Sequence, residues 1–207
     1  MILLVVMDKA SRHPTEGIAS ELFTPEAPID ESEIVPTRYV EDLINSMLDP
    51  AGLGIEASAS SDTGDIRGEF DWPDVLDKVG KLRNLPPDMD LDLHLIVFRS
   101  TYKSDMDTDM AELLDAADMD AFREAMYKAP SAFLYYYREA GRSFCLWTDI
   151  HEARRATKGL AHDRATVLAP LAYETAKIEA YKVSRLENGS RVEIEDKYTV
   201  YPLEHAA

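Results

Sequence analysis

Imidazole, phenol and indole side chains in the second half of the chain are the residues best suited to chemistry. His94 and His162 can exchange protons near neutral pH, where imidazole titrates. Tyr135 and Tyr137 can orient a ligand through their hydroxyls, and Trp147 can form an apolar wall. A few polar groups in an apolar setting are typical of a small-molecule site. The same residues can equally form a hydrophobic core, so both interpretations stay open.

The stretch 142–165, RSFCLWTDIHEARRATKGLAHDRA, partly matches the His-Glu-x-x-His signature of zinc proteases. That signature needs a second His four residues after the first, so that both imidazoles face one metal. Here His151 and Glu152 are followed by Arg155 at that position. The acidic runs 88–92 and 105–109 lack the glycine and glutamate that close a calcium loop. We therefore predict no metal and no cofactor.

Composition narrows the possible partners. Asp and Glu number 39 against 22 Lys and Arg, for a net charge of −17. Such a surface repels phosphate backbones, so we expect neither nucleic acid nor membrane as a partner. The longest apolar run, residues 1–7, is far shorter than the ~20 residues of a membrane helix. A single cysteine, Cys145, excludes an internal disulfide and fits the reducing cytoplasm.

The elements that would position these side chains are clearest from residue 88 onward. Apolar and β-branched residues predict a strand over 91–102, and helical spacing predicts a helix over 107–130. Residues 131–147 read as a hairpin, 149–176 as a helix broken at Gly159, and 177–186 as a strand. Alternation would send Tyr135 and Tyr137 to one face, and Leu134 and Tyr136 to the other. The order β-α-β-β-α-β predicts an α+β fold of the ferredoxin-like type.

The flanking segments are harder to interpret. Residues 1–7 suggest a strand, 11–36 an extended loop and 56–68 a polar loop. One helix is expected between Thr37 and Pro50, and another from Asp71 to the prolines at 86–87. Asn188–Gly189 predicts a C-terminal β-hairpin. We thus divide the chain into an N-terminal extension (1–87), a ferredoxin-like domain (88–186) and a C-terminal strand and tail (187–207).

Residues 91–186 resemble the dimeric α+β barrel superfamily, especially the antibiotic-biosynthesis-monooxygenase-like domains. The resemblance rests on the element order and on FCLWTDIHEARRATKGLAHDRA, in which Trp147 ends a strand and His162 opens the last helix. It implies the strand order 4-1-3-2 and a homodimer. Members include cofactor-free oxygenases of polycyclic aromatics and haem-degrading enzymes. The haem-degrading branch carries a Trp and a His where this chain has Ala156 and Thr166, so haem degradation is not expected.

Two functions follow as expectations. The first is a small-molecule-binding protein, with cofactor-free oxygenase-like chemistry on an aromatic or polyketide-like substrate. His162 or His94 would act as base, while Tyr135, Tyr137 and Trp147 would bind the substrate. The second is a non-catalytic module whose aromatics form core and dimer contacts. A plait leaves one sheet face without helices, so either a second copy or the N-terminal helices must cover it.

Overall fold

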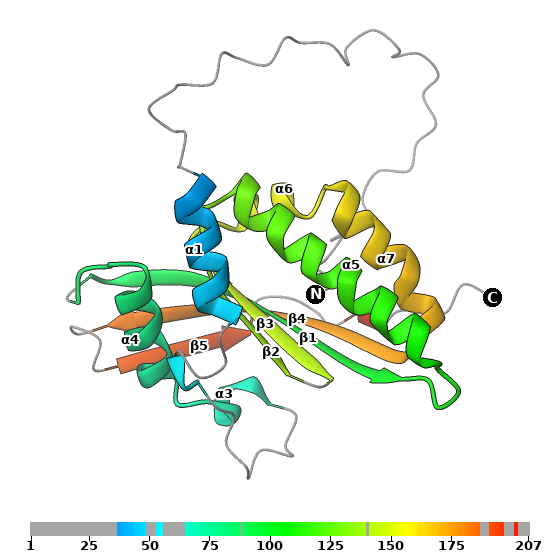
Figure 1. Ribbon diagram of the computed structural model, residues 1–207. Coiled ribbons are helices and arrows are strands. Elements are labelled where there is room, and N and C mark those ends of the chain that lie inside the picture. Colours follow the sequence, from blue (N-terminus) through cyan, green and yellow to red (C-terminus); the bar gives the residue numbers. More distant parts are fainter. Residues whose placement is uncertain are drawn as a thin grey trace, which may run out of the picture.

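The computed structural model describes residues 37–48, 53–55, 65–87, 89–139, 141–186, 191–196 and 201–202 (Figure 1). The strand expected at 1–7, the loop at 11–36 and the Asn188–Gly189 turn lie outside these residues. Within them the chain is an α+β protein built on one antiparallel sheet. No helix in this part of the chain is both long enough and apolar enough to cross a membrane.

The strands are β1 (Leu91–Tyr102), β2 (Phe133–Glu139), β3 (Arg142–Trp147), β4 (Tyr173–Leu186), β5 (Arg191–Asp196) and β6 (Tyr201–Pro202). They lie in the order β2-β3-β1-β4-β5, and the short β6 also pairs with β4. The helices are α1 (Thr37–Leu48), α3 (Ile66–Glu69), α4 (Trp72–Leu82), α5 (Thr108–Lys128), α6 (Ile150–Ala156) and α7 (Leu160–Ala172). The first four strands therefore run β4-β1-β3-β2 across the sheet.

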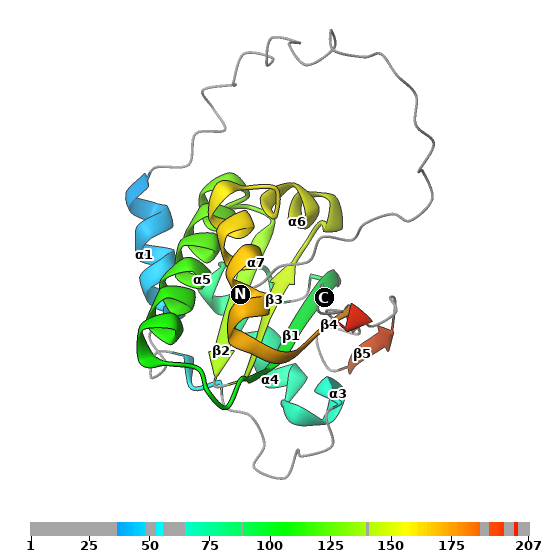
Figure 2. The ribbon, with the colours of Figure 1, turned by 90° about the vertical axis from the view of Figure 1, so that its right-hand side faces the viewer.

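Helices cover both faces of the sheet. Helices α5, α6 and α7 lie on one side, and α3 and α4 lie on the other (Figures 1 and 2). Helix α1 packs beside α5 and the outer strand β2. We expected either a second copy or the N-terminal helices to cover the second face of the sheet. In the structure α3 and α4, which belong to the N-terminal segment, cover this face. A continuous set of buried apolar residues links these layers.

Local sequence signals explain where most helices begin. The side chain of Asp107 accepts a hydrogen bond from the Met110 amide at the start of α5. Asp149 caps α6 in the same way, by accepting from the His151 amide at 2.6 Å. The predicted break is present, since α6 ends at Ala156 and α7 begins after Gly159.

Three predicted boundaries were wrong. The polar loop over 56–68 contains the start of α3, whose N-cap is Asp65. The helix predicted to reach residue 176 ends at Ala172, because residues from Tyr173 onward pair with β1 and this pairing overrides their helical composition. Helix α4 ends before the prolines at 86–87, since Asn84 takes a left-handed conformation with φ of 54°.

Candidate functional site

The sheet separates the predicted binding residues onto its two faces. The ring of Tyr137 lies 5.1 Å from that of Phe70, which directly follows α3. The ring of Trp147 stacks on Phe133 at 4.4 Å, and Phe133 in turn packs against Phe122 of α5. Trp147 therefore lies under the helix layer formed by α5, whereas Tyr137 lies on the α3–α4 side.

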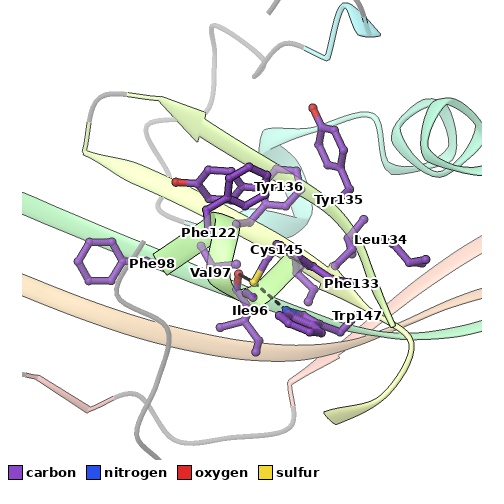
Figure 3. Close-up of a cluster of buried hydrophobic side chains, with 14 of the residues drawn as sticks. Ile96, Val97, Phe98, Phe122, Phe133, Leu134, Tyr135, Tyr136, Cys145 and Trp147 are labelled. Carbon is purple, nitrogen blue, oxygen red and sulfur yellow. Dashed lines mark hydrogen bonds between the residues drawn. The ribbon is translucent and has the colours of Figure 1, made fainter. Parts of the chain in front are cut away.

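A β-bulge in β2 changes the predicted alternation. Phe133 pairs with Trp147, but Tyr135 pairs with the next residue, Leu146, so Leu134 is the extra residue. As a result Phe133 and Tyr136 both face α5, where each contacts Phe122. Figure 3 shows Tyr136 beside Phe122, with Tyr135 pointing away from them. The prediction that Tyr135 and Tyr136 occupy opposite faces is confirmed.

The two tyrosines predicted to bind substrate are enclosed by the chain's own side chains. Tyr135 is buried, and burial raises its pKa to about 12. The Tyr137 hydroxyl donates to a carboxylate oxygen of Glu139 at 2.9 Å, and burial together with this bond raises the Tyr137 pKa to about 12. Phe144 stacks on Tyr137 at 5.0 Å and contacts Phe70 at 5.1 Å. These rings fill the space at this part of the α3–α4 face.

Four polar residues meet on the opposite, helix-covered face. Asp118 comes from α5, Tyr136 from β2, His162 from α7 and Tyr173 from β4, and none is more than 3% exposed. We call these residues the Asp118 group. The charge of Asp118 acts on the pKa of each of the other three. Sequence reasoning identified only His162 of this group as a candidate.

His162 is a neutral imidazole in this setting. Burial lowers its pKa to about 4, even though the nearby carboxylates of Asp163 and Asp118 oppose the shift. Its Nδ1 lies 3.5 Å from the Thr166 hydroxyl, while Nε2 is buried and has no hydrogen-bond partner in the described structure. A neutral ring can donate through one nitrogen and accept through the other. His162 is therefore better suited to hydrogen bonding than to holding a proton at pH 7.

The two phenols of the group remain protonated. Burial raises the pKa of Tyr136 and of Tyr173 far above pH 7. Tyr173 shares a hydrogen bond with Ser100, whereas the Tyr136 hydroxyl is buried without a partner among the described residues. The ring of Phe122 stacks on Tyr136 at 4.7 Å and shields it from water. A buried hydroxyl without a partner costs about 1–3 kcal/mol.

A carboxylate from α5 fixes the start of α7, where His162 lies. Glu124 accepts a hydrogen bond from the Ala161 amide at 2.9 Å and pairs with Lys128 at 2.8 Å. A Cβ at Gly159 would lie 2.2 Å from a Glu124 carboxylate oxygen, so a side chain at this position would displace the end of Glu124. Glu124 and Gly159 thus position the imidazole of His162 against the sheet.

His94, the other candidate base, lies apart from the Asp118 group. It pairs with Trp147 across β1 and β3 and is half-buried. Burial lowers its pKa, and the charged neighbours that act on it, led by Asp149 and Lys182, do not include Asp118. Its Nδ1 is buried and has no hydrogen-bond partner in the described part of the chain. His151, by contrast, is exposed, as predicted.

Cys145 is part of the core beneath the helices. The Trp147 indole donates to its sulfur at 3.0 Å (Figure 3), and burial raises the thiol pKa to about 12. A thiol this deeply buried and this weakly acidic is a poor nucleophile. Across the described ranges, no three His, Cys, Asp or Glu side chains gather in a metal-binding arrangement.

The fold and the Asp118 group define an α+β protein with helices on both faces of an antiparallel sheet and a buried polar cluster on one face. The chain belongs to the PB2B2.08-like family, whose model matches residues 59–196. No curated protein and no solved structure matches it. The matched region includes α3 and α4 as well as strands β1–β5, so it begins ahead of the boundary predicted at residue 88.

Proposed function

We propose that residues 88–186 form a ferredoxin-like plait of the dimeric α+β barrel type. The support is the element order β-α-β-β-α-β and the strand order β4-β1-β3-β2, which corresponds to 4-1-3-2. Trp147 ends β3 and His162 lies in the first turn of α7, at the positions on which the resemblance rests. Strand β5 then extends this plait at the β4 edge.

We further propose that the protein binds a small aromatic molecule at the Asp118 group. One observation carries this proposal: two buried polar atoms on the helix-covered face, His162 Nε2 and the Tyr136 hydroxyl, have no partner in the described structure. The charge of Asp118 acts on the pKa of both residues. Evolved proteins keep few such atoms, and an absent ligand or water is a common reason for them. A polar group of a ligand could bond either atom.

The ligand chemistry follows from the protonation states. Protonated Tyr136 and neutral His162 offer one certain donor and one nitrogen that can accept, which suits a phenol or a ketone. The aromatic rings of Phe122 and Tyr136 give this region an apolar wall for a flat molecule. The low pKa of His162 supports binding more strongly than proton abstraction, because a base of pKa near 4 is weak.

Catalysis would be a second step at the same place. His162 would take a proton from the acidic methylene of an enolisable ketone, and dioxygen would add to the resulting carbanion. The peroxide would take the proton back and lose water, leaving a second ketone. Atoms and electrons balance without a metal or flavin. Oxygen uptake with anthrone, an enolisable tricyclic ketone, tests this step separately from binding.

A non-catalytic module is the alternative, and a specific observation favours it. Aromatic rings pack closely on both faces of the sheet, including Trp147 on Phe133 at 4.4 Å and Phe144 on Tyr137 at 5.0 Å. The α3–α4 cover also supports a chain that shields its own sheet face. Light scattering at micromolar concentration is then expected to give a monomer, whereas a dimer would support the homodimer that the resemblance implies.

Calorimetric titration with 1-naphthol tests the binding site. The proposal predicts saturable binding to the wild-type chain, weakened about tenfold by Tyr136→Phe or His162→Gln through loss of one hydrogen bond. His151→Gln is the matched control, because His151 is exposed on the neighbouring helix α6, and it should leave affinity unchanged. Absence of naphthol binding, or equal binding by all variants, would support the module instead.

A further inference from the structure

Three basic residues stand side by side across three neighbouring strands. Arg99 of β1 is directly opposite Arg142 of β3 on one side and Lys177 of β4 on the other. We call these three residues the cationic row. Directly opposed residues share one face of a sheet, and like charges so placed are destabilising. The guanidinium of Arg142 lies over the Phe70 ring at 5.7 Å, so the row faces α3 and α4.

A carboxylate from outside the sheet lies in the middle of this row. One oxygen of Glu69 is 2.7 Å from Arg99 Nη2, and the other is 2.9 Å from Arg142 Nη1. The Glu69 side chain is completely buried, while those of Arg99 and Arg142 are about one-fifth exposed. Glu69 is the last residue of α3, a helix of four residues that starts at the Asp65 cap.

The sheet supplies two further carboxylates, which do not balance the row. Glu139 pairs with Arg142 at 2.7 Å. Glu179 lies 3.3 Å from Arg99 Nε, forms an ion pair with Lys177 and accepts a hydrogen bond from the Tyr181 hydroxyl. Three cations and two sheet carboxylates leave a net charge of +1. The sheet alone therefore presents a site for one more carboxylate, which Glu69 provides.

We propose that the cationic row is a carboxylate-binding site and that Glu69 is its tethered occupant. Arginine is well suited to carboxylate recognition. Here Arg99 forms an ion pair with one Glu69 oxygen, and Arg142 donates a hydrogen bond to the other. The ligand class is a small monocarboxylate, since one negative charge makes the site neutral. This site lies on the face opposite the Asp118 group, so it is independent of the function proposed above.

Chemical rescue of Glu69→Ala with acetate tests the site. In chloride buffer this substitution should lower Tm by about 10 °C, because Arg99 and Arg142, which are only about one-fifth exposed, lose the buried carboxylate between them. Acetate should restore at least half of that loss with a saturable dependence, since it replaces the missing carboxylate. Pivalate, which is too bulky for the space of a Glu side chain, should restore little.

Asp65→Ala is the matched control. It removes another carboxylate from the same segment, but Asp65 is exposed and forms its ion pair with Arg67 rather than with a residue of the row. Its Tm should respond equally to acetate and chloride at one ionic strength. Equal responses of Glu69→Ala to acetate, chloride and pivalate would overturn the proposal, because they would leave Glu69 as only a structural ion-pair partner.

A refolding measurement covers the case in which Glu69→Ala does not fold in chloride. The Trp72 indole donates to the Ile66 carbonyl oxygen at 3.0 Å, so native Trp72 emission reports that α3 is in place. Refolding from urea in a Trp147→Phe background should recover this emission in acetate and not in chloride. Failure to recover it in acetate would equally overturn the proposal.

Discussion

Tyr136→Phe should make the ligand-free protein more stable. The hydroxyl that this change removes is buried and has no hydrogen-bond partner in the described structure, while the ring keeps its stacking on Phe122. A buried polar group in that state costs about 1–3 kcal/mol. Removing it should therefore raise the free energy of unfolding by about 1 kcal/mol, after allowing for relaxation around the small gap left behind. Urea denaturation at pH 7 measures this value.

The neighbouring residue provides the control. The Tyr137 hydroxyl donates to Glu139 at 2.9 Å, so Tyr137→Phe removes a bond that is made and should lower stability by up to about 1 kcal/mol. The two variants delete the same atom from consecutive residues on opposite faces of β2. If Tyr136→Phe instead destabilises the protein as much as Tyr137→Phe does, the Tyr136 hydroxyl has a partner, and the reasoning behind the Asp118 group fails.

Three further results are expected. Gly159→Ala should cost about 1 kcal/mol in urea denaturation, because the new methyl group displaces the end of the Glu124 side chain and removes its hydrogen bond to the Ala161 amide; an unchanged midpoint would refute this contact. Cys145 should not react with a thiol reagent in the folded chain and should react fully in urea; rapid native labelling would contradict its burial. The His162 pKa is lowered from 6.5 to about 4, so its contribution to stability is complete above pH 6.5 and falls by about 2–3 kcal/mol as pH drops to 4. His162→Gln should lack that part of the pH dependence, and identical pH profiles for the two proteins would exclude the shift.

Strong local patterns made the central strands predictable. The strand expected over 91–102 is β1, with those bounds, because its β-branched and aromatic run has no helical alternative. The break at Gly159 was also predicted from the sequence. The start of β4 was not, since the Glu174–Ala176 stretch has a helical composition and becomes a strand only by pairing with β1. Long-range pairing decides such segments.

The site was less predictable than the fold. His162 was identified as a candidate, but Asp118 and Tyr173 of the same group were not found. In a chain with 39 acidic residues, a single carboxylate on a helix is expected to lie on the solvent-exposed surface. The helical spacing of Asp118 could have indicated its burial, because it lies on the same face of α5 as the buried Leu114, Ala117, Ala121 and Phe122. Helix α3 was missed because four residues carry little periodicity, and its placement depends on Glu69 reaching two arginines of the sheet.

Nitrogen-15 NMR of the histidine rings tests the central claim most directly. The chain has five histidines, so the His162 signals can be assigned by comparison with His162→Gln. Titration with 1-naphthol should shift the Nε2 signal of His162 saturably, with the ring remaining neutral at pH 7, and should leave His151 unchanged. An unshifted His162 at naphthol concentrations that saturate binding elsewhere, or equal small shifts of all five histidines, would contradict a ligand site at the Asp118 group.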